Sequence, residues 1–139
     1  EGADLRRAHL EGAILQEAHL EGAKLSFARL EGADLFAVHL EGAKLRFVQL
    51  EGANLVYAHL EGSDLGRAKL DGALLQLAET DVHTDLARAQ ISAATQFGDR
   101  LIDWADLPES EKEAARAPWI GRGAINVDAP RPEQSRMRD

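Results

Sequence analysis

A strict ten-residue pattern of apolar and polar positions runs through the first eighty residues. With few departures the segments follow Glu-Gly-Ala-x-Leu-x-x-Ala-x-Leu. Each ten divides into two fives, because a small residue recurs two positions before a leucine until the last copy decays at Glu79-Thr80. Neither the 3.6-residue period of a helix nor the two-residue period of a strand produces a strict apolar period of five. Glycine at one phase of every ten would also cost a helix interior roughly 1 kcal/mol each time. The pattern therefore excludes a long helix.

The fives resemble the pentapeptide-repeat family. Ala-Asp-Leu occurs at 3–5 and 33–35 and Ala-Asn-Leu at 53–55, within about sixteen consecutive fives that cover residues 1–79. The resemblance implies a β fold, a right-handed quadrilateral parallel β-helix, or solenoid, in which four fives form one square coil of twenty residues. Val38 and Val48 are larger than the usual alanine and Ser63 is polar, but we expect the register to persist through them. About four coils are then expected.

The physical properties of the fives agree with such a coil. One small and one branched apolar residue per five suits a narrow interior, and the three other positions point outward. Stacked coils about 4.8 Å apart place equivalent side chains above one another, so each coil is stabilised by contacts with its neighbours.

The repeat loses its phase after Ala78, and two interpretations of residues 84–94 are open. They form either two more fives after a one-residue slip or a helix with Thr84 as its N-cap. We prefer the helix, because its apolar side would cover the open end of the solenoid.

A second helix is expected within residues 108–117. Ser110 and Glu113 have the spacing of a capping box, and Pro118 supplies a stop. The side chains expected to pack this segment on the cap are Trp104, Leu107, Trp119 and Ile120. The predicted organisation is a β-helix over residues 1–79, a short C-terminal α-helical cap over 80–120, and a flexible tail or extended strap over 121–139. Because the chain begins in full repeat without Met, we expect it to be a fragment of a longer protein.

Composition narrows the functional classes. The chain has 24 Asp and Glu against 16 Lys and Arg, a net charge of −8, which disfavours direct nucleic-acid binding through a basic face. It has no Cys and no apolar run near the 18 residues of a spanning helix, so we expect no membrane segment and assign it to the cytoplasm by default. No phosphate loop, nucleophile elbow or His-Glu-x-x-His motif occurs. We therefore expect neither catalysis nor a cofactor.

A twenty-residue coil aligns two acidic ladders on opposite sides of the rod. One contains Glu1, Glu21, Glu41 and Glu61, and the other contains Glu11, Glu31, Glu51 and Asp71. Acidic turn positions can simply keep a repeat soluble. The alternative is imitation of DNA, because the resemblance extends to acidic rods that protect DNA gyrase, a type II topoisomerase, from inhibitors. Solubility is the preferred interpretation, since four coils span ~19 Å, less than one ~34 Å turn of DNA.

Histidine forms a third column, made of His19, His39 and His59. Stacked imidazoles could bind Zn²⁺ or Ni²⁺. Zinc sites normally gather four ligands in a tetrahedron, however, and a flat ladder offers its ligands in a line. A solvated surface column is therefore the preferred interpretation, and no metal is expected.

Outward apolar residues predict a contact surface, because a repeat surface is usually polar. Phe27 and Phe47 are expected to stack at one corner between Arg7 and Arg67. A second group, on another side, consists of Phe36, Val56, Tyr57 and Leu77. We expect the chain to be a structural and protein-interaction module that binds an unknown protein or forms a homodimer.

Overall fold

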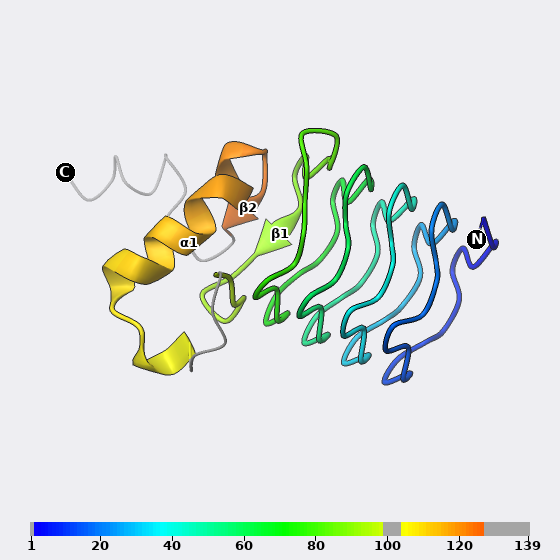
Figure 1. The fold of residues 1–139 in the computed structure, drawn as a ribbon, viewed down its shortest axis with the longest axis horizontal. Helices are drawn as coiled ribbons and strands as arrows, with labels where there is room; N and C mark the ends of the chain where they lie inside the picture. The colour runs from blue at the N-terminus through cyan, green and yellow to red at the C-terminus, as the bar shows by residue number, and fades with distance from the viewer. Residues whose placement is uncertain (1, 99–103, 127–139) are drawn as a thin grey trace, which may run out of the picture.

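Parallel backbone pairing twenty residues apart organises the chain. The computed structural model describes residues 2–98 and 104–126. Four columns of bridges run along the molecule: Asp4 to Lys24, Lys44 and Asp64; His9 to Arg29, Gln49 and Lys69; Ile14 to Asp34, Asn54 and Leu74; and His19 to His39, His59 and Glu79. The predicted twenty-residue coil of a β-helix is thus confirmed. The coils stack along one axis (Figure 1).

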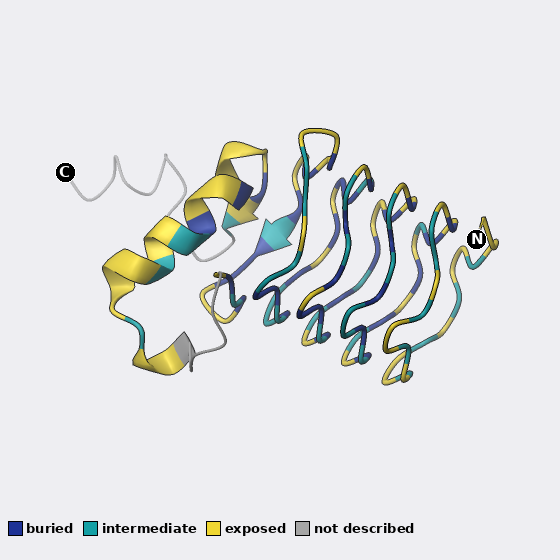
Figure 2. Cartoon of the chain, in the orientation of Figure 1, coloured by how far each residue is buried: buried dark blue, intermediate teal, exposed yellow. Residues whose placement is uncertain are grey.

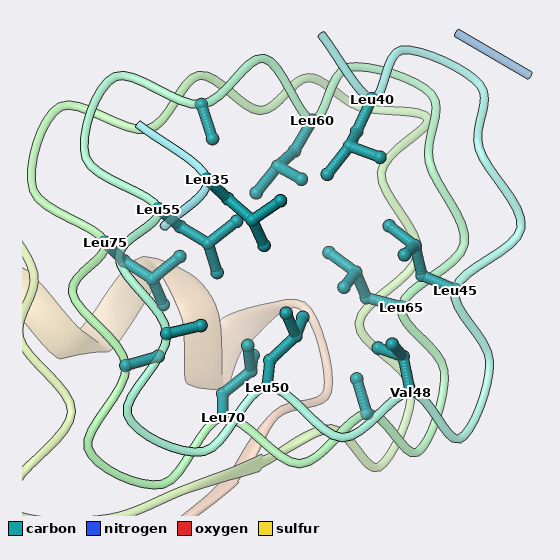
Figure 3. Close-up of a cluster of buried hydrophobic side chains, with 14 of the residues drawn as sticks. Leu35, Leu40, Leu45, Val48, Leu50, Leu55, Leu60, Leu65, Leu70 and Leu75 are labelled. Atoms are coloured by element: carbon teal, nitrogen blue, oxygen red, sulfur yellow. The ribbon is translucent and has the colours of Figure 1, made fainter. Parts of the chain in front are cut away.

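The interior is made of leucine and alanine, as the period of five predicts. Each of the first three coils directs four leucines inward, as the consecutive Leu35, Leu40, Leu45 and Leu50 illustrate (Figure 3), and the fourth coil contributes Leu65, Leu70 and Leu75. From the second coil onward these side chains are at most 2 % exposed. In the first coil the leucines are half-buried, because the described residues place a coil on one side of them alone (Figure 2).

The departures from the repeat fit the interior without a change of register. Val38 and Val48 are fully buried in alanine positions. Ser63 is also fully buried, and its hydroxyl donates a hydrogen bond to the carbonyl oxygen of Leu60 at 2.7 Å. The polar atom is therefore satisfied inside the rod.

Each five ends in a turn closed by a hydrogen bond from the small residue to the preceding leucine carbonyl, with a positive φ at the third turn residue. Glycine occupies this position in alternate turns. The other turns force a side chain into the left-handed region, with φ between 53° and 62°: Arg7, Glu17, Phe27, Ala37, Phe47, Tyr57, Arg67, Leu77 and Arg88. An L-residue in this conformation costs roughly 1–2 kcal/mol.

Two neighbouring turns, one with glycine and one with alanine at the positive-φ position, allow this conformational cost to be tested by exchanging the two residue types. Gly32 has φ +67° with nothing within 4 Å of an added Cβ, and Ala37 has φ 53° in the next turn. Both amides donate to the following coil at 2.9 Å. We expect Gly32→Ala to lower the free energy of unfolding by about 1 kcal/mol and Ala37→Gly to raise it by about 0.5–1 kcal/mol. Urea denaturation of both variants measures this; a loss of stability in Ala37→Gly would show that its backbone is not strained.

The predicted helix over residues 84–94 is wrong. The chain instead forms a fifth coil, with bridges from Asp64 to Asp85, Lys69 to Gln90 and Leu74 to Gln96. The first offset of 21 residues corresponds to the one-residue slip that was the alternative interpretation, and a second extra residue follows before Gln96. The coil region therefore extends to residue 98, and the predicted boundary at 79 is too early.

Two threonines explain how the coil survives these slips. Thr84 and Thr95 occupy the small position of a five and are 5 % and 0 % exposed. Their hydroxyls donate to carbonyl oxygens of the preceding coil, Thr84 to Leu60 at 2.9 Å and Thr95 to Leu70 at 2.8 Å. Thr84 is thus a buried coil residue and not a helix N-cap.

A short helical segment covers the end of the fifth coil (Figure 1). It consists of the 3₁₀ helix η1 (Trp104–Asp106) and helix α1 (Glu109–Gly121). The N-cap of α1 is Pro108, without a side-chain capping bond, so the predicted Ser110/Glu113 capping box is not formed. Pro118 lies inside the helix and does not end it, because the helix runs on to Gly121. No helix in the described part of the chain is long and apolar enough to cross a membrane.

Trp119 is the buried aromatic side chain of α1 and contacts the last coil. Its side chain is 9 % exposed and packs on Phe97, with ring centroids 5.2 Å apart. Leu107 also packs against the core, as predicted, whereas Ile120 is 44 % exposed, so its predicted packing is wrong. The side chain of Trp104 lies outside the described part of the structure.

The start of the predicted tail is strand β2 (Ile125–Asn126). It pairs in parallel with β1 (Gln90–Ile91), in the register Gln90 to Ile125 and Ile91 to Asn126. This short strap adds one more rung to one side of the fifth coil. Of the two alternatives predicted for the tail, the extended strap is confirmed at residues 125–126, and residues 127–139 lie outside the described part.

Candidate functional site

The two acidic ladders lie at turns on opposite sides of the coil. In each ladder the glycine amide after a glutamate donates to the carbonyl of the next glutamate, as in Gly22 to Glu41 and Gly32 to Glu51, both at 2.9 Å. The carboxylates are not fully extended into solvent: one oxygen is buried in each of Glu21, Glu31, Glu41, Glu51 and Glu61. In Glu11 the residue's own backbone amide, followed by His9 and Arg29, lowers the pKa of the carboxyl. Glu1 lies outside the described residues.

The ladders separate two halves of the rod that differ in charge. All eight Lys and Arg of residues 1–80 lie in the tens that begin at positions 1, 21, 41 and 61, together with six acids. The tens that begin at 11, 31, 51 and 71 contain seven acids and no Lys or Arg. We name these the arginine half and the histidine half. A net charge summed over the whole repeat hides this division, but sorting charges by the twenty-residue period reveals it.

The arginine half contains a continuous stack of side chains. Phe27 and Phe47 are parallel, with centroids 4.8 Å apart. The guanidinium of Arg7 lies 5.0 Å from the centroid of Phe27, and that of Arg67 lies 5.7 Å from the centroid of Phe47. The structure therefore confirms the predicted stack between two arginines. Cation–π contacts cover the outer ring faces, so mainly the ring edges are exposed.

The histidine half carries the second predicted apolar group, with one exception. Phe36 and Tyr57 meet edge to face at 5.7 Å, and Tyr57 is 42 % exposed. Leu77 is half-buried, and Ile14 on the same half is 79 % exposed. Val56 is only 9 % exposed, so it contributes little surface to this predicted group. It lies in its column between the larger Phe36 and Gln76, one coil to either side, which together shield it.

The histidine column forms as predicted. The rings of His19 and His39 stack with centroids 4.5 Å apart, and those of His39 and His59 with centroids 4.6 Å apart, all nearly parallel. Nδ1 of His19 lies 2.9 Å from the Glu21 carboxylate, and Nδ1 of His39 lies 3.2 Å from that of Glu41. The hydrogen bond with His19, followed by the backbone amide of Glu21, lowers the pKa of the Glu21 carboxyl.

The last rung of this column is a glutamate. Glu79 lies in the next coil, where its backbone is bridged to that of His59. Nδ1 of His59 lies 3.1 Å from Oε2 of Glu79 and 3.7 Å from Oε1 of Glu61. Burial, together with a hydrogen bond to Glu79, raises the pKa of the Glu61 carboxyl. The sequence interpretation stopped at the three histidines and missed Glu79, although position 79 continues the twenty-residue spacing from His59.

A hollow of about 470 Å³ lies where α1 meets the last coil. Its lining includes Leu75, Phe97, Leu107 and Trp119, and the charged residue that it contains is Glu111.

Comparisons with known proteins place this architecture in context. A family model described as "Pentapeptide repeats" matches residues 3–42 and 40–78, with eight copies. The crystal structure of Rfr23, a pentapeptide repeat protein from the cyanobacterium Cyanothece 51142, is 37 % identical with a TM-score of 0.54 over 58 % of this chain and 62 % of that chain. This chain therefore spans less than two thirds of Rfr23.

HetL, a pentapeptide repeat protein from the cyanobacterium Nostoc sp. strain PCC 7120 involved in heterocyst differentiation regulation, is 33 % identical with a TM-score of 0.35, over 67 % of this chain and 46 % of that chain. A pentapeptide repeat protein of the Arabidopsis thaliana thylakoid lumen is 20 % identical with a TM-score of 0.36, over 94 % and 84 %. No curated protein matches the chain.

Proposed function

The chain belongs to the pentapeptide-repeat family, and on this premise we propose that it is a non-enzymatic interaction module, a rigid rod whose exposed side-chain columns bind another protein. We further infer that its coil is right-handed and four-sided, the form that pentapeptide-repeat structures such as Rfr23 lead us to expect. The paired carboxylates of the rod lie on its outer wall, where water is not excluded. They are therefore poor candidates for acid–base catalysis.

The exposed apolar side of the histidine half supports this proposal most strongly. Ile14 is 79 % exposed and Tyr57 is 42 % exposed, with Phe36 and Leu77 on the same half. On a repeat whose outward positions are mostly polar, grouped apolar side chains favour a contact surface. The Phe27/Phe47 corner is a weaker candidate, because arginines already cover the outer faces of its rings.

The first partner to test is a second copy of the chain. We expect the wild type to have about twice the 15.1 kDa mass of one chain in light scattering at micromolar concentration, and Tyr57→Lys to have the mass of a monomer. A lysine at this exposed site would bring an uncompensated charge into an apolar contact.

Gln49→Lys is the matched control, because it adds the same charge in the arginine half. It should leave the mass unchanged. A monomeric wild type, or a dimer that survives Tyr57→Lys, would argue against self-association through this side.

The alternative proposal is an acidic rod that binds a type II topoisomerase such as DNA gyrase in place of DNA. The seven acids of the histidine half, without Lys or Arg, favour it. Two features weaken it: one oxygen of several ladder carboxylates is buried, and the arginine half carries eight cations. We therefore rank it second.

A further inference from the structure

The histidine ladder ends in a cluster whose ligand atoms converge from two stretches of the chain, residues 59–61 and Glu79 one coil further on. Nδ1 of His59, a carboxylate oxygen of Glu61 and a carboxylate oxygen of Glu79 all lie within 4.8 Å of one another. We propose that these three side chains bind a divalent transition-metal ion such as Zn²⁺ or Ni²⁺, with water completing the coordination. This inference does not depend on the proposed interaction function.

The distances are close to those of a coordination sphere. Metal–nitrogen and metal–oxygen bonds to zinc are about 2.0–2.2 Å, so neighbouring ligand atoms are roughly 2.9–3.5 Å apart. The observed separations from His59 Nδ1 are 3.1 Å to Glu79 and 3.7 Å to Glu61. Small side-chain rotations therefore bring the atoms to bonding distance, and imidazole with carboxylates is a ligand set that suits both ions.

Charge gives a second reason for a cation at this place. The ion pairs that the described residues show for Glu61 and Glu79 are those with His59. The two carboxylates thus face one imidazole, and close like charges repel each other unless a proton or cation lies between them. A divalent ion supplies that charge, and Glu79 is exposed enough for an ion to reach the cluster from solvent.

The other rungs of the ladder are poorer sites. His19, Glu21 and His39 form one group and His39, Glu41 and His59 another, each with a single carboxylate. Their imidazole rings are parallel to within 5°. Because nitrogen lone pairs lie in the ring plane, those of stacked parallel rings point side by side and do not converge on one ion. Only the His59 rung, among the described groups, combines one imidazole with two carboxylates.

Titration calorimetry of the full chain with ZnCl₂, and separately with NiCl₂, tests the proposal. We expect the wild type to bind one ion, and Glu79→Gln and His59→Asn to weaken the affinity at least about tenfold. Glu79 is exposed, so its substitution should not affect folding; circular dichroism verifies this for each variant.

The matched control is His9→Asn. His9 Nδ1 lies 3.3 Å from the Glu11 carboxylate, so it belongs to a similar His–Glu pair without the second carboxylate found at His59. Its substitution should leave the affinity unchanged. The proposal is overturned if the wild type binds neither ion below millimolar concentration, or if Glu79→Gln binds as tightly as the wild type.

Discussion

Replacing Leu45 by alanine is expected to lower the free energy of unfolding by about 3–5 kcal/mol. Leu45 is fully buried, and its column neighbours Leu25 and Leu65 lie one coil to either side. Truncation leaves a cavity on the axis of the rod, and hydrogen-bonded backbone above and below prevents the coils from closing on it. Since each coil is held by its neighbours, the loss weakens two interfaces together. Urea denaturation followed by circular dichroism measures the change.

Leu5→Ala is the matched control, because Leu5 occupies the same column in the first coil. It is half-buried and has a described coil on one side alone. Its substitution should lower the free energy of unfolding by less than half as much as Leu45→Ala does. Equal losses at the two positions would contradict an axial core whose stability depends on neighbours on both sides.

Trp119→Ala is expected to lower the free energy required to open the C-terminal end by about 3–5 kcal/mol. The indole packs on Phe97 of the fifth coil, and β2 is the next element after α1 in the chain. Without it, α1 and the strap should separate from the coil while the inner coils stay folded, because stability in a stacked repeat is local. Hydrogen exchange checks this at the Ile125 amide, which donates to Ala89 at 2.6 Å.

Ile120→Ala is the control for this prediction. Ile120 lies beside Trp119 on the same helix but is 44 % exposed, so its truncation should leave exchange at Ile125 nearly unchanged. If Trp119→Ala leaves that exchange unchanged as well, the helix does not hold the end of the rod.

The coil could be predicted from the sequence because its pattern is repeated every five residues. The residue at which the coil ends could not be predicted. In the fifth coil Thr84 and Thr95 replace alanine and Phe97 replaces leucine, while two extra residues shift the phase. The same stretch also suits an amphipathic helix. Cross-coil hydrogen bonds decide between the two, from the backbone of the fifth coil as well as from the threonine hydroxyls.

The candidate sites show a similar limit. Columns of outward residues follow from the period alone, so the histidine stack and the Phe27/Phe47 stack were predictable. The burial of Val56 was not, because it depends on the sizes of its column neighbours. The convergence of Glu61 and Glu79 on His59 depends on side-chain direction, which a period does not describe.

Nuclear Overhauser contacts between ring protons twenty residues apart test whether equivalent residues of successive coils lie above one another. We expect cross-peaks between Phe27 and Phe47 and between His39 and His59, whose ring centroids lie 4.8 Å and 4.6 Å apart. Absence of both, with helical contacts between residues three and four apart in the first eighty residues, would contradict a stacked coil.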